Sequence, residues 1–367
     1  MNSQKAKTIQ PEISIIGCGI AGLTTAFHLG QKGYKINLID PEVNSKINNI
    51  NPKNGTQAAL GVLMGNIYKR SKGRAFFLRN RSMKLWKEWL IQINFSGSNI
   101  NIEKPLIKLA NSKQEYQSML EIYKNKKELG IQVLDKVSIE FWNSIFEKKL
   151  IGGLISYEDG RLDPIKLTQS LMQSLDKIKV NKIEDSVIRI KKNINSIYKN
   201  WTIDLKNNES ITQDYIVICS ALNTQKLLRP LGHSLLLNPI LGQVIELEIE
   251  NTAINLNNWP AILNYQSINF INHKTNRILI GATIESGSKP NLLNKMEMLN
   301  MDNTAPQWLR KAKICHEWHG IRARPSNQAA PILKELEPGL LVNSGHYRNG
   351  ILLAPSCAEW VGLQIKS

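Results

Sequence analysis

The sequence predicts a mixed α/β protein, because three features follow one another near its start. A short apolar strand, residues 13–16, leads into the glycine-rich turn Gly-Cys-Gly-Ile-Ala-Gly at 17–22. An apolar helix follows, and a second strand, 34–39, ends in Asp40. Strand, turn, helix, strand and terminal acid in this order are typical of a dinucleotide-binding βαβ unit.

Each glycine of the turn has its own role. Gly17 permits the tight turn, Gly19 lets the backbone approach a diphosphate, and Gly22 lets the helix pack closely on the strand. Ile20 and Ala21 open the helix, whose N–H groups and dipole favour a diphosphate. Asp40 lies 18 residues after Gly22, where a carboxylate accepts hydrogen bonds from an adenosine ribose. These residues predict an ADP-containing cofactor and leave NAD and FAD open.

Composition narrows the class of protein. With 367 residues, 42% of them hydrophobic, two domains are expected. The longest apolar runs are shorter than the ~20 residues of a membrane span, and the first residues lack an apolar signal region, so we expect a cytoplasmic protein. The net charge of +17 comes from dispersed lysines, which favours a solvated surface over a nucleic-acid partner.

The cysteines and histidines give no metal signal. Four scattered cysteines suggest neither a disulfide framework nor a zinc site. His316 and His319 lie in a stretch that looks extended, where alternate residues face opposite sides, so we interpret them as ordinary strand histidines. We therefore expect no metal.

The remaining chain alternates between helical and extended patterns. A polar loop is expected at 41–55, and a helix could start among the small residues 55–63. The sequence predicts charged helices at 114–127 and 135–147 as an insertion covering the first domain. It predicts further helices at 75–93, 165–175 and 355–365, the last with Pro355 in its first turn. Strands are expected at 186–190, 201–205, 214–218, 239–248 and 277–285, the last two in an antiparallel sheet.

Several motifs together resemble one family. They are Gly-Arg-Leu-Asp-Pro at 160–164, Gly-Gln at 242–243, Gly-Ala-Thr-Ile-Glu at 281–285, Trp-His-Gly-Ile-Arg at 318–322 and Gly-His-Tyr-Arg-Asn-Gly-Ile-Leu-Leu-Ala-Pro at 345–355. Over nearly its full length the chain resembles the D-amino-acid oxidase superfamily of FAD enzymes, most closely the glycine oxidase branch associated with thiamine biosynthesis.

The resemblance implies an interleaved architecture. A discontinuous, Rossmann-like FAD-binding domain would comprise residues 1–90, 149–230 and 315–367. An α+β substrate domain with an antiparallel sheet would comprise residues 91–148 and 231–314. The resemblance also implies further FAD-binding residues: Gln57, Ala58, Ala59, Val187, Ala221, His346, Tyr347, Arg348, Asn349, Gly350, Ile351 and Leu352.

By the same resemblance, Arg322 grips the substrate carboxylate, with Arg348 as the next candidate. The chemistry agrees, since a bidentate guanidinium is the best holder of an α-carboxylate. The N-terminus of the last helix would offer N–H groups and a positive dipole to the negative charge of a reduced flavin.

The implied reaction is oxidation of glycine or another small amino acid. A hydride passes from Cα to flavin N5, the imino acid hydrolyses to a 2-oxo acid and ammonia, and O2 reoxidises the flavin to give H2O2. Such a reaction needs no strong general base if the amine binds neutral. The product could supply thiamine biosynthesis, and a homo-oligomer is compatible with the sequence.

The sequence departs from the family at two places, and it leaves alternatives open. Ala221 stands where relatives have glycine, which is expected to crowd the nucleotide. The strand at 267–272 lacks the family's tyrosine and proline, so glycine need not be preferred. The alternatives are a D-amino-acid dehydrogenase that reduces a quinone, a flavin domain of a tRNA-modifying enzyme, and a flavoprotein without catalysis.

Overall fold

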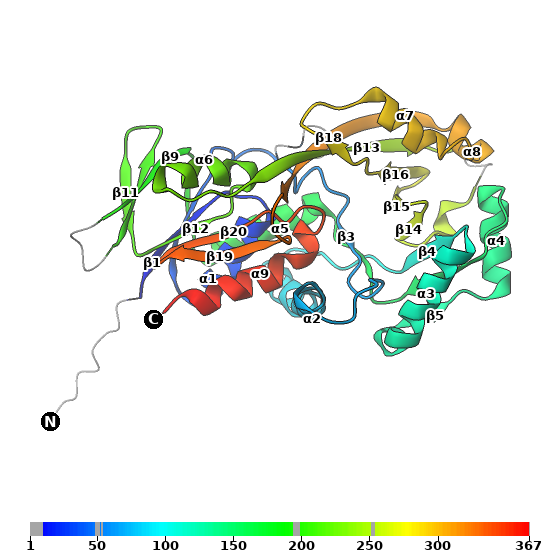
Figure 1. Cartoon of the computed structure of the whole chain (residues 1–367), viewed down its shortest axis with the longest axis horizontal. Helices are drawn as coiled ribbons and strands as arrows, with labels where there is room; N and C mark the ends of the chain where they lie inside the picture. Colours follow the sequence, from blue (N-terminus) through cyan, green and yellow to red (C-terminus); the bar gives the residue numbers. More distant parts are fainter. Residues whose placement is uncertain (1–9, 48–51, 53, 194–198, 251–253, 367) are drawn as a thin grey trace.

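The computed structural model describes residues 10–47, 52, 54–193, 199–250 and 254–366. Two large β-sheets form the two halves of an elongated molecule, with helices packed beside and between them (Figure 1). The first nine residues, and residues 48–51 and 53 of the loop expected at 41–55, lie outside the described residues.

The first half contains the predicted βαβ unit. Within the described residues its sheet has six strands, and β1 pairs in parallel with both β2 and β12. The predicted mixed α/β fold is therefore confirmed, and the edge strand β19 runs antiparallel to β20. The strand order is β19 (Ile332–Glu337), β20 (Leu340–Ser344), β12 (Tyr215–Ile218), β1 (Glu12–Ile16), β2 (Lys35–Ile39) and β8 (Asn181–Ile183).

Two hydrophobic clusters cover the faces of this sheet. Apolar side chains of four helices form one cluster with the sheet, and Trp201 belongs to the other, together with residues of a three-stranded sheet. The helices are α1 (Ile20–Gln31), α2 (Arg74–Asn94), α5 (Pro164–Lys177) and α9 (Gly350–Gln364). The three strands are β9 (Val187–Lys192), β10 (Trp201–Leu205) and β11 (Ser210–Gln213).

The second half is built on a larger, mainly antiparallel sheet. β13 pairs with β18 from Leu237 opposite Pro325 to Glu248 opposite Lys313, and this long ribbon reaches toward the first half (Figure 1). In order, the strands are β17 (Glu285–Ser286), β13 (Leu237–Glu248), β16 (Arg277–Gly281), β15 (Ile268–Lys274), β14 (Ile262–Tyr265), β4 (Leu106–Ala110), β6 (Gly152–Ser156) and β5 (Ile131–Val133), with β18 (Lys313–Pro325) beside β13. Shorter elements are β3 (Val62–Leu63), β7 (Gly160–Arg161), α6 (Thr224–Leu228), α7 (Leu292–Asn300) and α8 (Gln307–Lys311).

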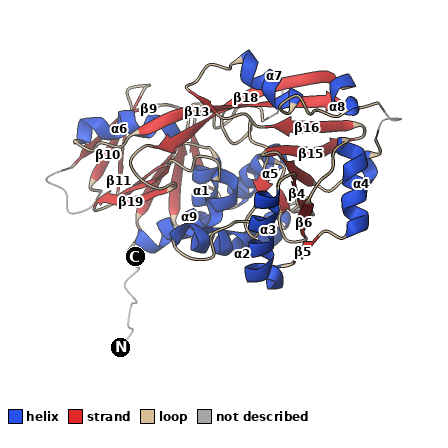
Figure 2. Cartoon of the chain, turned by 45° about the vertical axis from the view of Figure 1, so that its right-hand side comes forward, coloured by secondary structure: helices blue, strands red, loops and turns tan. Residues whose placement is uncertain are grey.

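The two charged helices lie elsewhere than expected. α3 (Lys113–Lys126) and α4 (Lys136–Phe146) lie beside the second sheet, near β4, β6 and β5, and do not cover the first half (Figure 2). Aromatic packing holds α4 there: the ring centroids of Trp142 and Trp259 are 5.5 Å apart, and those of Phe146 and Phe270 are 5.7 Å apart. α3 buries Met119 and Ile122 in one hydrophobic cluster with residues of β4, β5 and β6. The small residues at 55–61 form turns before β3, so a helix starting there was a wrong expectation.

The last helix begins earlier than the sequence predicts. α9 starts at Gly350, so Pro355 lies inside it and not in its first turn. A proline there deprives the carbonyl four residues earlier, that of Ile351, of its helical partner. The indole Nε1 of Trp86 donates a hydrogen bond to this carbonyl at 3.0 Å. A hydrogen bond from α2 therefore replaces the helical bond that the proline removes. The helix can continue through Pro355, and its N-terminus is at Gly350.

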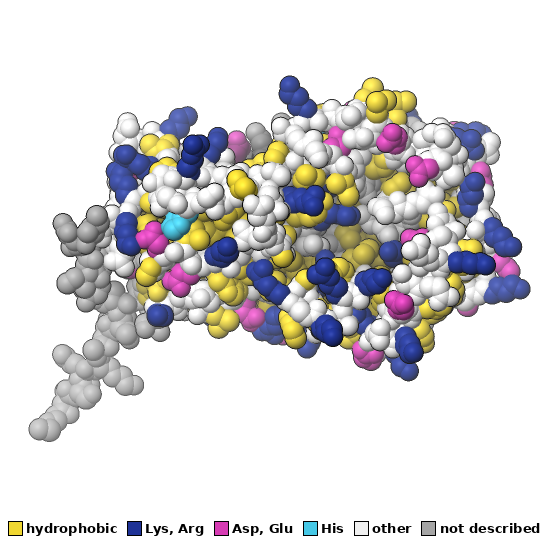
Figure 3. Space-filling model, in the orientation of Figure 1, with side chains coloured by type: hydrophobic (Ala, Val, Ile, Leu, Met, Phe, Trp, Pro, Cys, Tyr) yellow, Lys and Arg dark blue, Asp and Glu magenta, His cyan; other side chains and the backbone are white. Residues whose placement is uncertain are grey.

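No helix in the described part of the chain is long and apolar enough to cross a membrane. On the face shown in Figure 3, Lys and Arg side chains extend from one end of the molecule to the other, with Asp and Glu among them.

The division into two discontinuous domains stays a prediction, as does the absence of a nucleic-acid partner.

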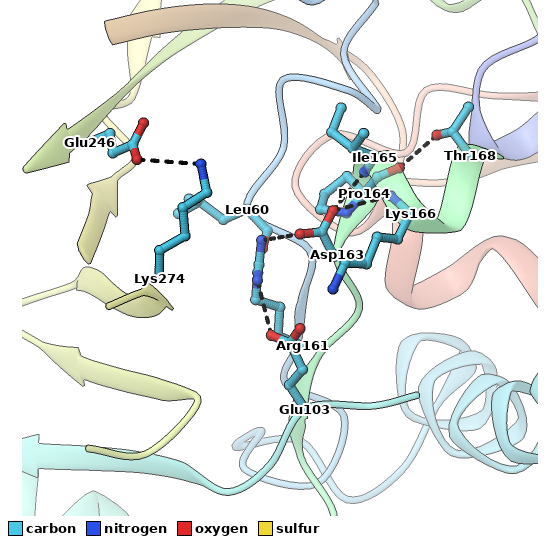
Figure 4. Close-up of polar contacts among 10 residues, drawn as sticks. All are labelled: Leu60, Glu103, Arg161, Asp163, Pro164, Ile165, Lys166, Thr168, Glu246 and Lys274. Atoms are coloured by element: carbon cyan, nitrogen blue, oxygen red, sulfur yellow. Dashed lines mark hydrogen bonds and ion pairs between the residues drawn. The ribbon is translucent and has the colours of Figure 1, made fainter. Parts of the chain in front are cut away.

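The motif at 160–164 joins distant segments through one buried arginine. Arg161 is 3% exposed, and it lies between Leu60, Glu103 and Asp163 (Figure 4). Its Nε donates to the carbonyl of Leu60 at 2.9 Å, Nη1 to Glu103 at 2.9 Å and Nη2 to Asp163 at 3.1 Å.

Asp163 also caps α5. Its Oδ1 accepts the N–H groups of Ile165 and Lys166 at 2.9 and 3.2 Å. Burial alone would raise the pKa of Asp163, but Arg161 and these N–H groups outweigh it and lower that pKa. The carboxylate therefore stays charged, and Arg161 fixes the start of α5 relative to the segment around Leu60.

Removing this arginine tests how much the junction stabilises the fold. Arg161→Met should lower the free energy of unfolding by about 3 kcal/mol or more, because it leaves an enclosed carboxylate without its partner. Arg189→Met is the matched control: the Arg189 side chain is 58% exposed, and its pair with Asp204 is worth about 0–1 kcal/mol. Denaturant titration of both variants measures the difference. Equal losses would contradict the assigned role.

Candidate active site

A cavity of about 840 Å³ extends from the glycine turn after β1 to the second sheet. It brings together sixteen of the predicted site residues, from segments far apart in the sequence. They are Gly17, Gly19, Ile20, Ala21, Asp40, Ala58, Ala59, Ala221, Arg322, His346, Tyr347, Arg348, Asn349, Gly350, Ile351 and Leu352. Three others do not line it: Gly22 is in α1, Gln57 is buried in the turn before Ala58, and Val187 begins β9.

The glycine turn is built for close approach. A Cβ on Gly17 would lie 2.8 Å from the carbonyl oxygen of Cys219, and one on Gly22 would lie 1.8 Å from that of Gly17. A Cβ on Gly19 would meet nothing closer than Thr56 Oγ1, at 3.6 Å. Gly17 and Gly22 are therefore required by the protein's own packing, whereas Gly19 keeps space open for a ligand.

The start of α1 offers hydrogen-bond donors to the cavity. Thr56 Oγ1 accepts the N–H of Ile20 at 2.9 Å, which ties the turn to the segment before β3. The N-cap residue of α1 is Gly19, which has no side chain to cap the helix. The other N–H groups of the first turn and the helix dipole are therefore available to a diphosphate.

Asp40 braces the glycine turn. Its Oδ2 accepts the N–H of Cys18 and its Oδ1 that of Glu42, both at 2.9 Å. Each carboxylate oxygen keeps a second acceptor position, so Asp40 can still receive a ribose hydroxyl. Burial and then Asp40 raise the pKa of the Cys18 thiol, which therefore stays protonated.

Ala221, where the resemblance leads us to expect glycine, has an unusual backbone conformation. Its φ is +47°, in the left-handed region where a side chain costs about 1–2 kcal/mol. The carbonyl oxygen of Ala221 accepts a hydrogen bond from Ser344 Oγ at 3.3 Å. Alanine at this position therefore has a conformational cost, and it also adds a methyl group to the cavity wall.

A buried arginine that sequence reasoning missed supports the N-terminus of α9. Arg79 is 8% exposed, and its Nη2 donates to Asn349 Oδ1 at 3.0 Å while its Nη1 donates to the carbonyl of Met64 at 2.8 Å. Its guanidinium lies 3.9 Å from the ring centroid of Tyr68. The available signal was spacing: Arg79 precedes the buried Ser82 and Met83 by three and four residues, which places it on the apolar face of α2.

Arg322 projects from β18 into the cavity. Its Nη1 donates to the carbonyls of Leu241 and Thr283, both at 3.1 Å. A Cβ on Gly242 would lie 2.2–2.5 Å from the guanidinium, so that glycine makes room for it. Burial, and next the charge of Arg348, lower the pKa of Arg322. The guanidinium remains charged at neutral pH and has Nε and Nη2 to offer to a ligand.

A polar network fixes one of these carbonyls. Gln243 Nε2 donates to Glu285 Oε1 and to the carbonyl of Asn291, both at 2.8 Å. Thr283 Oγ1 accepts the N–H of Gln243 at 2.8 Å and donates to Glu285. Burial would raise the pKa of Glu285, but the hydrogen bonds from Thr283 and Gln243 outweigh it and lower that pKa. The motifs at 242–243 and 281–285 therefore position Arg322.

The segment before α9 brings a neutral histidine and an exposed arginine to the cavity. Burial lowers the pKa of His346 to about 4, so its ring is neutral at pH 7, and its Nε2 has no partner among the described residues. Tyr347 donates its N–H to the carbonyl of Ala323 at 3.1 Å, which joins this segment to β18. Arg348 is exposed and adds its positive charge near Arg322 and Arg79.

These residues fit FAD. One end has the close backbone approach, open helix N-terminus and acid that an ADP moiety requires. The other end has the N-terminus of α9, where Asn349 makes no side-chain cap within the described chain, beside small residues Ala58 and Ala59. The individual contacts of the predicted residues with FAD stay predictions.

Comparison with known proteins gives consistent matches. The sequence profile of the family DAO, described as FAD dependent oxidoreductase, matches residues 12–362. The glycine oxidase of Bacillus licheniformis is 22% identical over 94% of this chain and 90% of its own length. The bifunctional protein ThiO/ThiG of Nostoc is 24% identical over 95% of this chain and 52% of its own length. The crystal structure of glycine oxidase from Geobacillus kaustophilus superposes with a TM-score of 0.81 at 21% identity, covering 98% of this chain and 95% of the other.

Two glycine substitutions separate folding from cofactor binding. Gly22→Ala should destabilise the protein even without FAD, because the new Cβ meets a backbone carbonyl. Gly19→Ala should leave the stability of the apoprotein unchanged and weaken FAD binding at least tenfold, because its methyl group enters the ligand space. Thermal unfolding of the apoproteins and fluorescence titration with FAD measure both effects. Normal FAD affinity in Gly19→Ala would contradict this placement of the diphosphate.

Asp40 gives a second test of the nucleotide end. Asp40→Ala should weaken FAD binding by about tenfold to a hundredfold, since a charged hydrogen bond is worth about 1.5–3 kcal/mol. The rate of flavin reduction at saturating FAD should not change. Asp40→Asn, which keeps an acceptor oxygen, should recover part of the affinity. Unchanged FAD affinity in the alanine variant would show that no ribose hydroxyl binds there.

Proposed function

The chain belongs to the family of FAD-dependent oxidoreductases and is an enzyme that uses FAD, and we propose that it oxidatively deaminates a small amino acid. Substrate, O2 and water would yield a 2-oxo acid, ammonia and H2O2. Glycine oxidases among its relatives support this substrate class. Supply of thiamine biosynthesis by the product stays a prediction.

The observation that carries the proposal is the state of Arg322. Its two hydrogen-bond acceptors within the described residues are neutral carbonyls, and Nε and Nη2 have no acceptor there. A largely enclosed guanidinium in this state favours an anionic ligand strongly. A planar fork matches a carboxylate with two parallel hydrogen bonds. The substrate's α-carboxylate is the group that fits.

The charges around the cavity also bear on the substrate amine. Among the described residues, the acids that line the cavity are Asp40 and Glu42, both at the nucleotide end. At the other end lie Arg79, Arg322 and Arg348. Positive charge disfavours an ammonium group and so lowers the pKa of a bound amine. The amine would bind neutral, with its lone pair available, and no carboxylate base would be needed.

FAD, when bound, supplies the two-electron acceptor. The residues of this chain bind and orient the substrate: Arg322 holds the carboxylate, Thr283 and Glu285 hold Arg322, and the apolar wall of Val244 and Ala282 limits the side chain. The N-terminus of α9 places positive dipole at the same end of the cavity. Positioning of this kind can supply much of the rate.

Substitutions of Arg322 test the proposal. Arg322→Ala should lower kcat/KM for amino acids by a factor that corresponds to a loss of about 3–5 kcal/mol in transition-state stabilisation. This is the range expected when one partner of an enclosed ion pair is removed. Arg322→Lys keeps the charge and loses the fork, so it should raise KM and slow flavin reduction. Anaerobic mixing with glycine, sarcosine and D-amino acids, followed by flavin absorbance, measures both effects.

Decarboxylated amines provide the control. They bring no carboxylate, so methylamine and ethylamine should react equally slowly with wild type and Arg322→Ala. FAD content should be the same in both proteins. If Arg322→Ala oxidises amino acids with a near-normal kcat/KM at full FAD content, the assignment is wrong and Arg348 becomes the candidate.

A further inference from the structure

Three polar residues form a row across neighbouring strands of the second sheet. Lys108 of β4 pairs with Asn264 of β14, and Asn264 pairs with Asn269 of β15. Residues opposite each other on neighbouring strands project to the same face, and strands are about 4.8 Å apart. All three line the cavity, so they form one polar wall on the face that looks toward the substrate end.

This row has unused donors. Lys108 is partly buried, and its Nζ has no hydrogen bond or ion pair to the residues that the structure describes. Asn264 Nδ2 donates to Asn269 Oδ1 at 2.9 Å and to the carbonyl of Ile268 at 3.3 Å. This orients the amide of Asn269 so that its Nδ2 remains available. An ammonium and an amide N–H₂ in one row form a donor set suited to an anion.

The row and Arg322 are separated by apolar wall. Asn269 pairs with Gly281 of β16, and Gly281 pairs with Val244 of β13, the strand beside that of Arg322. Gly242, Val244 and Ala282 line the cavity between the two polar groups. The backbones of Asn269 and Val244 are two strand spacings, roughly 10 Å, apart. A ligand that reaches both polar groups must therefore have charged ends joined by an apolar stem.

We propose that Lys108 and Asn269 form a second anion subsite, which selects small amino acids that carry a second carboxylate on the side chain or on the amine substituent. The inference rests on the proposed function, in which Arg322 holds the α-carboxylate. The second carboxylate accepts hydrogen bonds from Lys108 Nζ and Asn269 Nδ2. Lys108 comes from β4 and Asn269 from β15, so two neighbouring regions of the second sheet together set the preference.

A binding experiment on the FAD-loaded enzyme tests the subsite without turnover. Glutarate has two carboxylates on a three-carbon stem, and butyrate is its matched monocarboxylate. Calorimetric titration should show that glutarate binds at least about tenfold more tightly than butyrate. Lys108→Met, which keeps the stem length and removes the charge, should abolish this difference by weakening glutarate alone.

Two further variants complete the experiment. Lys334→Met removes an exposed lysine on β19 and should change neither affinity, which excludes a general effect of net charge. Asn269→Leu should weaken glutarate and leave butyrate unchanged. Equal affinities of the two ligands in wild type, or a glutarate affinity insensitive to Lys108→Met, would overturn the subsite. Equal weakening of both ligands by Lys108→Met would overturn it too, because that pattern reports a structural role.

Oxidation assays distinguish failure of the subsite from failure of the function. N-carboxymethylglycine, D-aspartate and D-glutamate should reduce the flavin with higher kcat/KM than sarcosine, D-asparagine and D-glutamine, and Lys108→Met should erase the preference. If the amides react as well as the acids, the subsite is wrong and the proposed function stands. If glutarate binds as expected but no amino acid reduces the flavin, the proposed function is wrong and the anion subsite stands.

Discussion

The structure depends on keeping an arginine charged in a cavity that it shares with other cations. Burial and the neighbouring charge of Arg348 both lower the pKa of Arg322, yet its hydrogen bonds go to the neutral carbonyls of Leu241 and Thr283. Carbonyls carry no net charge, and Glu285, although its charge acts on Arg322, is bonded to Thr283 and Gln243. We therefore propose that an anion completes the site. Gly242, the Gln243–Glu285 network and the β13–β18 ribbon can all be understood as means to hold this guanidinium in place.

The two ends of the cavity have opposite electrostatic character, and this follows from the topology. Asp40 ends β2 of the first sheet, so its charge lies beside the glycine turn. The basic residues come from α2, β4, β18 and the segment before α9, which line the rest of the cavity. Trp86 of α2 donates a hydrogen bond to the carbonyl of Ile351 in α9, which Pro355 leaves without a helical partner, and so links these two helices. Helix packing therefore fixes where the N-terminus of α9 lies.

Much of the fold was predictable because its signals are local. The strand at 13–16, the glycine turn and Asp40 lie in one stretch of sequence. Apolar periodicity placed α2 within one residue at each end, and the Asp163-Pro164 start signal placed α5 within one or two residues. The start of α9 was misplaced, because the bond from Trp86 that lets Pro355 lie inside the helix comes from 265 residues away. The position of α4 was missed for the same reason, since its aromatic partners are distant in sequence.

The residues of the site also divide into those that could be predicted from the sequence and those that could not. The resemblance supplied Arg322 and the segment at 346–352, while the basic residues from α2 and β4 went unnoticed. The spacing of Arg79 places it on the apolar face of α2, but a helical pattern does not show that this face borders a cavity. Arg79 and Lys108 became visible only when the tertiary structure showed what lies opposite them. The strain at Ala221 was likewise hidden, since φ depends on the turn and not on the residue alone.

The central claim is that Arg322 holds the substrate carboxylate, and a crystal structure of the FAD-loaded enzyme with glycolate, a carboxylate that has no amine, tests it most directly. The account predicts both carboxylate oxygens at about 2.7–2.9 Å from Nε and Nη2 of Arg322, with the Nη1 bonds to the two carbonyls retained. Glycolate bound through Arg348 alone, with Arg322 still bonded only to carbonyls, would contradict it.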